Sequence, residues 1–283
     1  MSLLTLCDGL EVDARVAGSR ALQYGDGVFR TLLYAQGQLI DWERHVDKLA
    51  ADCAALQLTM PDPVQLAVDA RRAVGSHREA IVKVIVARQA GERGYRSAGT
   101  ASECWIIASS APAENSLACR AGIRVAISEV TLAAQPLLAG IKHLNRLEQV
   151  LASRDWPADV DERLMCDAQG QLICGTRSNL FCVRGQRLLT PALNHCGVAG
   201  IMRGKLIDLA QAQGLDVSIQ ALRPGDLHRA DEVFICNAVI GLWPVCALDV
   251  QRWPAPGPLT QRLMQALAHP RVVLDPPMNT QGI

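Results

Sequence analysis

An almost unbroken apolar run at residues 80–87 constrains the fold of this chain more than any other stretch. It reads Ala-Ile-Val-Lys-Val-Ile-Val-Ala, and β-branched residues dominate it. Strands that are buried on both faces carry such runs, so we predict a strand near the centre of a sheet. The run ends in a loop at residues 88–96 with three arginines and two glycines. A loop of this kind suits the capture of an anion, although a solvated surface loop would have the same composition.

The bulk composition is that of a globular chain. Its 283 residues are 49% hydrophobic and 20% charged, which suffices for one large domain or two ordinary ones. The 28 basic and 28 acidic residues give a formal net charge of zero. We therefore predict no nucleic-acid partner, and expect a few placed cations to meet any anionic substrate.

Cysteine usage and hydropathy bear on the compartment. Ten cysteines are scattered without a Cys-x-x-Cys pair, which argues against a zinc site or a secreted disulfide framework and for free thiols. The first eight residues show no basic leader, and the longest uncharged run, residues 233–248, is too short to span a bilayer. We expect a cytoplasmic protein with no metal and no membrane association.

Hydrophobic periodicity and turn residues give a coarse map of the chain. Besides 80–87, strands are predicted at 28–34, 38–41, 103–109, 123–128, 162–167, 171–174, 180–184, 188–190 and 231–238. Helices are predicted at 42–56, 64–74, 201–213 and 259–268. Residues 114–121 form the predicted linker between an N-terminal α/β domain (1–113) and a C-terminal domain (122–283).

The segment with the most suggestive chemistry is Ile-Lys-His-Leu-Asn-Arg-Leu-Glu-Gln-Val at residues 141–150. Its apolar residues recur at helical spacing and predict a helix with one buried face from about Asn145: Leu144, Leu147, Val150 and Leu151. Lys142 precedes this helix in an apolar lead-in, where lost hydration favours the neutral amine. Such an amine can form a Schiff base with an aldehyde and later move protons. The alternative is a loop lysine whose amine reaches water.

This segment resembles the active-site lysine segment of the class-IV aminotransferase family, and more narrowly the aminodeoxychorismate lyases. Tyr-Gly-Asp-Gly-Val-Phe at 24–29 and Gly-Val-Ala-Gly-Ile-Met-Arg at 197–203 also resemble that family. The resemblance implies an α/β (α+β) two-domain fold of type IV, like D-amino-acid aminotransferase, working as a homodimer. It implies pyridoxal 5'-phosphate bound to Lys142, in the C-terminal domain, and conversion of 4-amino-4-deoxychorismate to 4-aminobenzoate and pyruvate. The alternatives are an aminotransferase for D- or branched-chain amino acids and a relative with impaired catalysis.

The resemblance also implies residues that bind the cofactor phosphate. Relatives usually have Arg at the position of Lys48, and lysine keeps the charge but loses the bidentate fork. Without the resemblance, Lys48 would be part of a solvated helix face. The glycine-spaced loop before residue 201 predicts an anion site at the main-chain amides of Ile201 and Met202, although two glycines could also mark a plain helix entry. Asn237 and Ala238 match the end of the family strand that closes the phosphate site.

Two residues differ from those usual in the family, and the loop at residues 88–96 resembles a family loop. Cys174 stands where relatives have a Glu that pairs with the pyridine nitrogen, and a thiol, with its usual pKa of about 8.5, is a weak acceptor there. Without the resemblance, Cys174 would be a small buried apolar residue. Arg30 stands where many members have Glu, and we assign it no role. The resemblance predicts Arg93 and Tyr95, with Arg88 as a weaker candidate, as residues that meet substrate carboxylates.

Overall fold

The computed structural model describes residues 6–91, 94–96, 99–113 and 116–272. Its contacts divide the chain into two compact units: Met1–Ala111 with Ile141–Arg146, and Pro112–Gly140 with Leu147–Ile283. The predicted domain boundaries stay a prediction. The segment Ile141–Arg146, which carries Lys142, has its contacts in the first unit.

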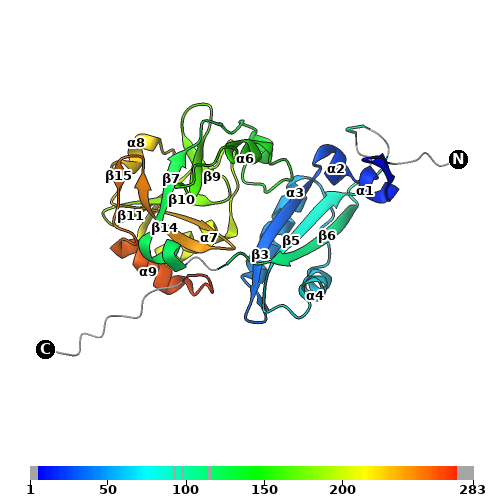
Figure 1. Ribbon diagram of the computed structural model, residues 1–283, viewed down its shortest axis with the longest axis horizontal. Helices are drawn as coiled ribbons and strands as arrows, with labels where there is room; N and C mark the ends of the chain where they lie inside the picture. The colour runs from blue at the N-terminus through cyan, green and yellow to red at the C-terminus, as the bar shows by residue number, and fades with distance from the viewer. Residues whose placement is uncertain (1–5, 92–93, 97–98, 114–115, 273–283) are drawn as a thin grey trace. The chain divides into compact units, whose positions relative to one another are not determined.

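The first unit is built on a four-stranded antiparallel sheet in the order β4-β3-β5-β6. Its strands are β3 (Gly27–Ala35), β4 (Gln38–Leu39), β5 (Glu79–Arg88) and β6 (Ser102–Ser110). The apolar run forms β5, which pairs with β3 on one side and β6 on the other (Figure 1). Val82, Val84 and Val86 are fully or almost fully buried, which confirms the prediction of an interior strand.

Two helices pack on this sheet. α3 (Trp42–Ala55) contacts β3, and α4 (Pro63–Val74) contacts β5 and β6. Side chains alternate across a strand, so Val28, Arg30 and Leu32 of β3 point to the same side, and all three are buried. Val28 and Leu32 belong to the hydrophobic core that the helices cover. Arg30 therefore places a guanidinium at a core position.

Four short elements precede β3: β1 (Leu6–Cys7), β2 (Leu10–Glu11), α1 (Ala14–Gly18) and α2 (Arg20–Tyr24). The sequence analysis did not predict them, because elements of two to five residues are too short to show a period. Ser19 caps α2 by accepting a hydrogen bond from the Ala21 N–H. This cap fixes the helix directly before the Gly-Asp-Gly turn.

The second unit contains a mixed sheet in the order β12-β11-β10-β13-β14-β7-β8-β9, with β15 paired to β14. The strands are β7 (Ile123–Ile127), β8 (Glu162–Cys166), β9 (Leu172–Gly175), β10 (Asn179–Arg184), β11 (Arg187–Pro191), β12 (Asp216–Gln220), β13 (Glu232–Asn237), β14 (Gly241–Leu248) and β15 (Gln251–Arg252). Phe181 of β10 and Phe234 of β13 stack with ring centroids 5.0 Å apart. β14 was not predicted because Pro244, which pairs with Phe234, argues against an interior strand.

The second unit also contains one 3-10 helix and five α-helices among its described residues: η1 (Pro136–Leu138), α5 (Ser116–Ala121), α6 (Leu147–Ala152), α7 (Ile201–Ala212), α8 (Pro224–Leu227) and α9 (Pro258–Leu267). α7 and α9 contact each other, and both contact β13. Ile201, Leu206 and Ala210 are among the buried residues of α7. Within the described ranges, no helix is long and apolar enough to cross a membrane.

The predicted helix from Asn145 with buried Leu147 and Val150 is wrong in two respects. α6 begins only at Leu147, and Leu147 and Val150 are 68% and 55% exposed. The Leu144 N–H donates to Gly27 O, and Asn145 Nδ2 donates to Gly25 O. These bonds tie both residues to the start of β3, so the helix cannot include them.

Candidate functional site

Lys142 lies in a short segment that pairs with the start of β3. Its carbonyl oxygen accepts a hydrogen bond from the Phe29 N–H at 2.9 Å, and His143 forms an antiparallel bridge with Val28. Lys142 Nζ lies 4.6 Å from the centroid of the Phe29 ring, within cation–π range. The sheet thus fixes the main chain of this lysine, and an aromatic ring attracts its amine.

One carboxylate, that of Asp52 on α3, joins Lys142 to two other cationic residues. Asp52 Oδ2 accepts a hydrogen bond from the Lys142 main-chain N–H at 3.2 Å and forms an ion pair with Arg30 Nη2. Asp52 Oδ1 accepts a hydrogen bond from Lys48 Nζ, one helical turn away. Asp52 is 1% exposed and Arg30 is 3% exposed. A buried charge without a partner is strongly destabilising, so Arg30 at its core position requires Asp52.

Positive charge is in excess around Asp52. Burial lowers the pKa of Arg30 to about 10, which leaves its guanidinium protonated at neutral pH. Burial, and then the positive charge of Arg30, lower the pKa of Lys48 to about 8. Burial and the charges of Arg30 and Lys142 lower the pKa of His45 to about 3, so its imidazole is neutral. An anion entering this cluster would therefore meet more positive than negative charge.

Two buried side chains of the cluster retain unused hydrogen-bonding atoms. Within the described part of the chain, Arg30 Nε and both ring nitrogens of His45 have no hydrogen-bond partner. Buried polar atoms are nearly always paired in native proteins, and those that are not usually meet a ligand, an ion or water. Together with the excess positive charge, these atoms could hold a polar, anionic group in the first unit.

Arg88, at the end of β5, has most of its donors committed within the protein. Its Nε donates to Asp26 Oδ2 at 3.0 Å and its Nη2 to Leu56 O at 2.7 Å. Its Nη1 donates to Gln57 O at 3.1 Å and to Gly99 O at 2.8 Å. Substrate binding by Arg88 stays a prediction, and these four bonds favour a role in holding the loop that follows β5.

Of the other two residues predicted to bind substrate, Tyr95 is 89% exposed on this loop, and Arg93 lies outside the described residues. Arg20 anchors the loop, because its Nη1 and Nη2 donate to the carbonyl oxygens of Gly94 and Tyr95 at 2.9 and 3.3 Å. Arg20 Nε donates to Asp26 Oδ2 at 2.9 Å, the same oxygen that Arg88 binds. Asp26 in the Gly-Asp-Gly turn thus holds two arginines that position the loop.

In the second unit, the predicted anion site lies at the start of α7. Gly200 precedes the helix and provides no side-chain cap. The first N–H groups of a helix lack acceptors within it, so the amides of Ile201 and Met202 are available at the positive end of the helix dipole. Asn179 fixes this entry: its Nδ2 donates to Val198 O at 2.9 Å, and its Oδ1 accepts from the Gly200 N–H at 3.2 Å. A Cβ at Gly200 would lie 2.3 Å from Asn179 Oδ1, so a larger residue there would displace the side chain that shapes this entry.

Asn237 ends β13, and its side chain builds the turn that follows. Its Oδ1 accepts hydrogen bonds from the N–H groups of Val239 and Ile240 at 2.8 and 2.9 Å. Its Nδ2 donates to Arg177 O at 3.2 Å, which uses one of two donors. The Asn237 side chain thus fixes the turn that contains Ala238 and ties it to the main chain of Arg177. Cofactor binding by Asn237 and Ala238 stays a prediction.

Cys174 lies on β9 and is 6% exposed. It packs in an apolar cluster with Leu132, Ala152, Met165, Ile173 and Cys196. Glu162 on the neighbouring strand β8 is a buried carboxylate, but Thr176 N–H, Thr176 Oγ1 and Ser178 Oγ all donate to it. These bonds commit Glu162 to the turn after β9, so it does not replace the carboxylate that Cys174 lacks.

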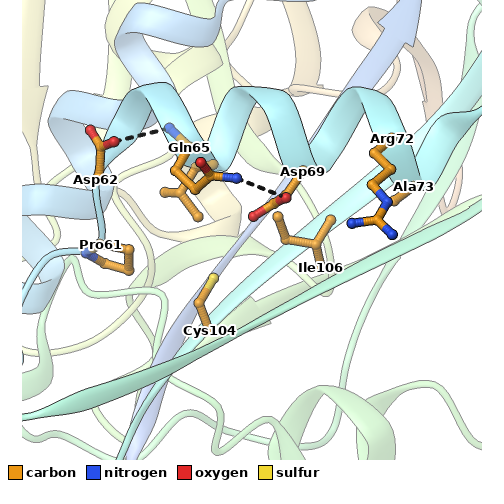
Figure 2. A pocket seen from close by; sticks show the side chains of 9 residues that line it. Pro61, Asp62, Gln65, Asp69, Arg72, Ala73, Cys104 and Ile106 are labelled. Atoms are coloured by element: carbon orange, nitrogen blue, oxygen red, sulfur yellow. Dashed lines mark hydrogen bonds between the residues drawn. The ribbon is translucent and has the colours of Figure 1, made fainter.

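A pocket of about 550 Å³ lies beside α4 and β6 in the first unit (Figure 2). Its lining residues are Pro61, Asp62, Gln65, Leu66, Asp69, Arg72, Ala73, Cys104 and Ile106. Asp62 accepts the Gln65 N–H as part of the α4 cap, and Gln65 Nε2 donates to Asp69 Oδ1 at 3.0 Å. None of the predicted site residues lines this pocket, so it is separate from the lysine cluster.

Comparison with known proteins decides the family. Residues 27–248 match the model of the class-IV amino-transferases. This chain belongs to the class-IV aminotransferase family. It is 36% identical over 256 residues to an aminodeoxychorismate lyase of Vibrio harveyi, a match that covers 87% of this chain and 93% of that protein. A putative branched-chain-amino-acid aminotransferase of Methanocaldococcus jannaschii is 31% identical over 248 residues, 84% of each chain.

A solved structure agrees with this assignment. The crystal structure of 4-amino-4-deoxychorismate lyase from Pseudomonas aeruginosa matches with a TM-score of 0.84 and 38% identity. The match covers 91% of this chain and 94% of that one. The predicted α/β (α+β) fold of type IV is therefore confirmed.

The residues of this class-IV chain fit pyridoxal 5'-phosphate in two respects and depart in one. In the first unit, unpaired nitrogens of Arg30 and His45 accompany Lys48 and Lys142, which suits an anionic aldehyde. In the second unit, α7 offers an uncapped N-terminus. The departure is Cys174, because a thiol is a weak partner for a protonated ring nitrogen. The chain therefore fits the phosphate and the aldehyde better than it fits the ring nitrogen.

Sequence analysis of this class-IV chain missed Asp52 and Lys83. Asp52 lies four residues after Lys48, a spacing at which oppositely charged side chains pair on a helix. Lys83 interrupts the apolar run of β5, and its Nζ also lies 4.6 Å from the centroid of the Phe29 ring. The signal that could have identified Asp52 and Lys83 is a charged residue within an otherwise apolar segment.

Proposed function

We propose that this protein is an aminodeoxychorismate lyase, a carbon–oxygen lyase that depends on pyridoxal 5'-phosphate. It would convert 4-amino-4-deoxychorismate to 4-aminobenzoate and pyruvate for folate biosynthesis. The observation that carries the proposal is the placement of Lys142 beside a buried cationic cluster. Asp52 binds its main-chain N–H, and the Phe29 ring contacts its amine. This arrangement occurs in a chain that is 36% identical to a lyase of that name over most of both sequences.

The proposed cofactor residues divide by the part of the cofactor they would bind. Lys142 Nζ would carry the aldehyde carbon covalently, and Cys174 would face the ring nitrogen. The phosphate would be bound by Lys48, the amides of Ile201 and Met202, Asn237 and Ala238. When bound, the cofactor supplies an electron sink for the substrate carbon that carries the amine.

Lys142 is also the proposed general base. Its Nζ, as a neutral amine, accepts the proton from C4 of the substrate while the enolpyruvyl oxygen leaves and the ring becomes aromatic. The bond from the Lys142 main chain to Asp52 and the contact of Nζ with the Phe29 ring keep this amine in place. We infer that aromatisation drives the elimination strongly enough for a thiol to stand at Cys174.

The two substrate carboxylates require cations or donors. We assign this role to Arg93 and Tyr95, on the loop after β5. Arg20 and Arg88 support the assignment indirectly, because both bind Asp26 and hold this loop by its carbonyl oxygens. A homodimer in the cytoplasm completes the proposal. Within the described residues no cysteine is in a disulfide, which suits a reducing compartment, and light scattering would test the dimer.

The first test is covalent trapping. The protein is loaded with pyridoxal 5'-phosphate, reduced with borohydride, digested and analysed by mass spectrometry. We expect the label on Lys142. A label on Lys83 or Lys48 instead, or no label, would show that the proposed lysine is wrong.

The second test separates the lyase from an aminotransferase, which the relative from Methanocaldococcus jannaschii makes the alternative. The loaded protein is incubated with aminodeoxychorismate in one arm, and with D-alanine or leucine plus an oxo acid in the other. Formation of 4-aminobenzoate without amino transfer supports the lyase. Amino transfer without 4-aminobenzoate would assign the protein to the aminotransferases.

A further inference from the structure

Arg30, Lys48 and the main chain of Lys142 come from three separate segments, and Asp52 contacts all of them. Arg30 lies on β3, Lys48 on α3, and Lys142 in the segment that pairs with β3. The Asp52 carboxylate is 1% exposed, so solvent does not share its contacts. Its bond to the Lys142 main chain helps to hold the reactive amine, but its ion pairs with Arg30 and Lys48 have no role in the proposed chemistry.

We propose that Asp52 is a positioning residue of the cofactor site, which keeps Lys48 charged beside Arg30 and fixes the main chain of Lys142. This inference rests on the proposed function only in taking pyridoxal 5'-phosphate as the ligand and Lys48 as a residue that binds its phosphate. It accounts for Arg30 as the buried cation whose charge Asp52 balances.

The argument begins with the charges that face Lys48. Arg30 on β3 and Lys142 on the paired segment are cationic neighbours, and His45 on α3 is neutral and buried. Arg44 lies one turn before Lys48 on the same helix, and Asp47 is adjacent but exposed. The thiol of Cys53 on α3 is neutral because burial raises its pKa to about 11. Asp52, one helical turn after Lys48, bonds directly to the Lys48 amine.

Removing that anion would change the charge of Lys48. With Asp52 in place, burial and Arg30 already lower the pKa of Lys48 to about 8. Without it, desolvation and the charge of Arg30 would act on a lysine that has lost one counter-charge, and the pKa of Lys48 would fall further towards neutral pH. A neutral amine binds phosphate much less strongly than an ammonium, because a charge-assisted hydrogen bond is about twice as strong as a neutral one.

A family arginine at this position would not need such a carboxylate, because a guanidinium stays protonated. Lysine does need it, since its pKa shifts readily on burial. Lys48 and Asp52 therefore form one functional unit: the lysine supplies the charge, and the carboxylate four residues later retains it. Arg30 makes Lys48 more dependent on Asp52, because Arg30 is a second buried cation that binds the same carboxylate.

The test compares the affinity of the full-length apoprotein for pyridoxal 5'-phosphate with its affinity for pyridoxal, which lacks the phosphate. Both ligands react with the same amine, so the contribution of this covalent step is common to both affinities. The ratio of the two affinities therefore reports the contacts with the phosphate. Equilibrium dialysis measures both at pH 6.0, 7.5 and 8.5 in wild type, Asp52→Asn, Lys48→Arg/Asp52→Asn and Asp47→Asn. Asp47→Asn is the matched control, because it removes an exposed carboxylate from the same helix.

For wild type, we expect the ratio of the affinity for pyridoxal 5'-phosphate to the affinity for pyridoxal to decrease as the pH rises from 7.5 to 8.5. For Asp52→Asn we expect a ratio at pH 7.5 that is lower by about tenfold, the value of one charge-assisted hydrogen bond, with recovery at pH 6.0. Lys48→Arg/Asp52→Asn restores the ratio at all three pH values, because arginine stays charged, and Asp47→Asn matches wild type. A wild-type ratio in Asp52→Asn at pH 7.5, or no rescue by arginine, would overturn the proposal.

Asp52→Asn leaves Arg30 without a counter-charge, so its folding must be checked by thermal melting. If it does not fold, Arg30→Met/Asp52→Asn removes both charges and tests the same idea. Burial, the larger cause of the lowered pKa of Lys48, remains in this variant, so we expect its ratio to be lower than the wild-type ratio at pH 7.5 and to recover at pH 6.0. A wild-type ratio at pH 7.5 in this folded double variant would overturn the charge-retaining role of Asp52.

The outcome is separable from that of the proposed function. Wild-type protein that binds pyridoxal 5'-phosphate but forms no 4-aminobenzoate would refute the lyase activity and leave the Asp52 comparison intact. Wild-type activity together with unchanged ratios in Asp52→Asn would refute the role of Asp52 alone. Wild-type protein that binds neither ligand would refute both.

Discussion

The two units offer different physical means of binding an anion. The first unit places charged side chains in a buried cluster, where Asp52 balances Arg30 and Lys48. The second presents main-chain amides at the uncapped start of α7, with Asn179 shaping the entry. Charged side chains respond to pH and to the loss of a partner, whereas main-chain amides do neither. The first unit is therefore the part of the protein in which single substitutions and pH have the largest effect.

The largest expected effect tests whether the lysine of the first unit carries the chemistry. Lys142→Arg keeps a positive charge but removes the amine that can react with an aldehyde and accept a proton. We expect production of 4-aminobenzoate to fall by about 10²- to 10⁴-fold, the usual range for a general base. Arg72→Lys, on the separate pocket beside α4, is the control and should leave the rate unchanged. Wild-type turnover by Lys142→Arg would contradict the role of this residue.

The next effect tests the cost of a buried charge in the first unit. Arg30→Met leaves Asp52 buried with one partner fewer, and we expect the free energy of unfolding to fall by about 3–5 kcal/mol. Arg30→Met/Asp52→Leu should recover most of this loss, because it removes both charges. Urea denaturation of the two variants and wild type measures the difference. A loss below about 1 kcal/mol in Arg30→Met would show that the pair is not a stabilising unit.

The buried histidine of the first unit, His45, should make the free energy of unfolding depend on pH. The folded-state pKa of His45 is lowered from 6.5 to about 3, so between these values the unfolded chain binds one more proton than the folded protein. The free energy of unfolding should therefore decrease as the pH falls through this window, by at most about 1.4 kcal/mol per pH unit for this group. His45→Gln should show a shallower decrease in urea titrations from pH 7 to pH 4. Parallel curves for the two proteins would contradict the buried neutral state of His45.

Two glycines of α7 sharpen the contrast in the second unit. Gly200→Ala forces a Cβ against Asn179 Oδ1, and we expect cofactor affinity to fall by about tenfold at every pH, as for one lost hydrogen bond to a charged group. Gly204 lies inside the helix with open space at its Cβ position, so Gly204→Ala should stabilise the protein by about 1 kcal/mol without changing affinity. Dialysis and urea denaturation measure these effects. Equal affinities in the two variants would exclude the α7 entry as a binding element.

The smallest expected effect concerns Cys174. If aromatisation drives the reaction, Cys174→Glu should change the turnover number by less than about tenfold, because the electron sink is not limiting. Introducing a carboxylate into the apolar cluster of β9 should also lower stability. Cys174→Ala is the control for lost volume. An increase of several orders of magnitude in turnover for Cys174→Glu would show that the cysteine is a defect, not a tolerated residue.

The sequence alone determined most elements that have a clear period. The strands at 80–87 and 103–109 and the helices at 42–56 and 64–74 were predicted within about two residues of their observed ends. The family, and with it the fold, followed from Lys142 and the glycine-spaced loop before Ile201. These features are local, because a strand, a helix or a short motif is encoded by neighbouring residues.

The tertiary structure decided what the charged residues do. Arg30 had no role in the sequence, and Asp52 was not noticed, because they lie 22 positions apart and meet only when α3 packs on β3. Likewise, the sequence did not show that Arg88 donates hydrogen bonds to Asp26 and three carbonyl oxygens. The physical reason is that a charge takes its partner from whatever the fold brings within a few ångströms, and that distance is not encoded in any single stretch of sequence.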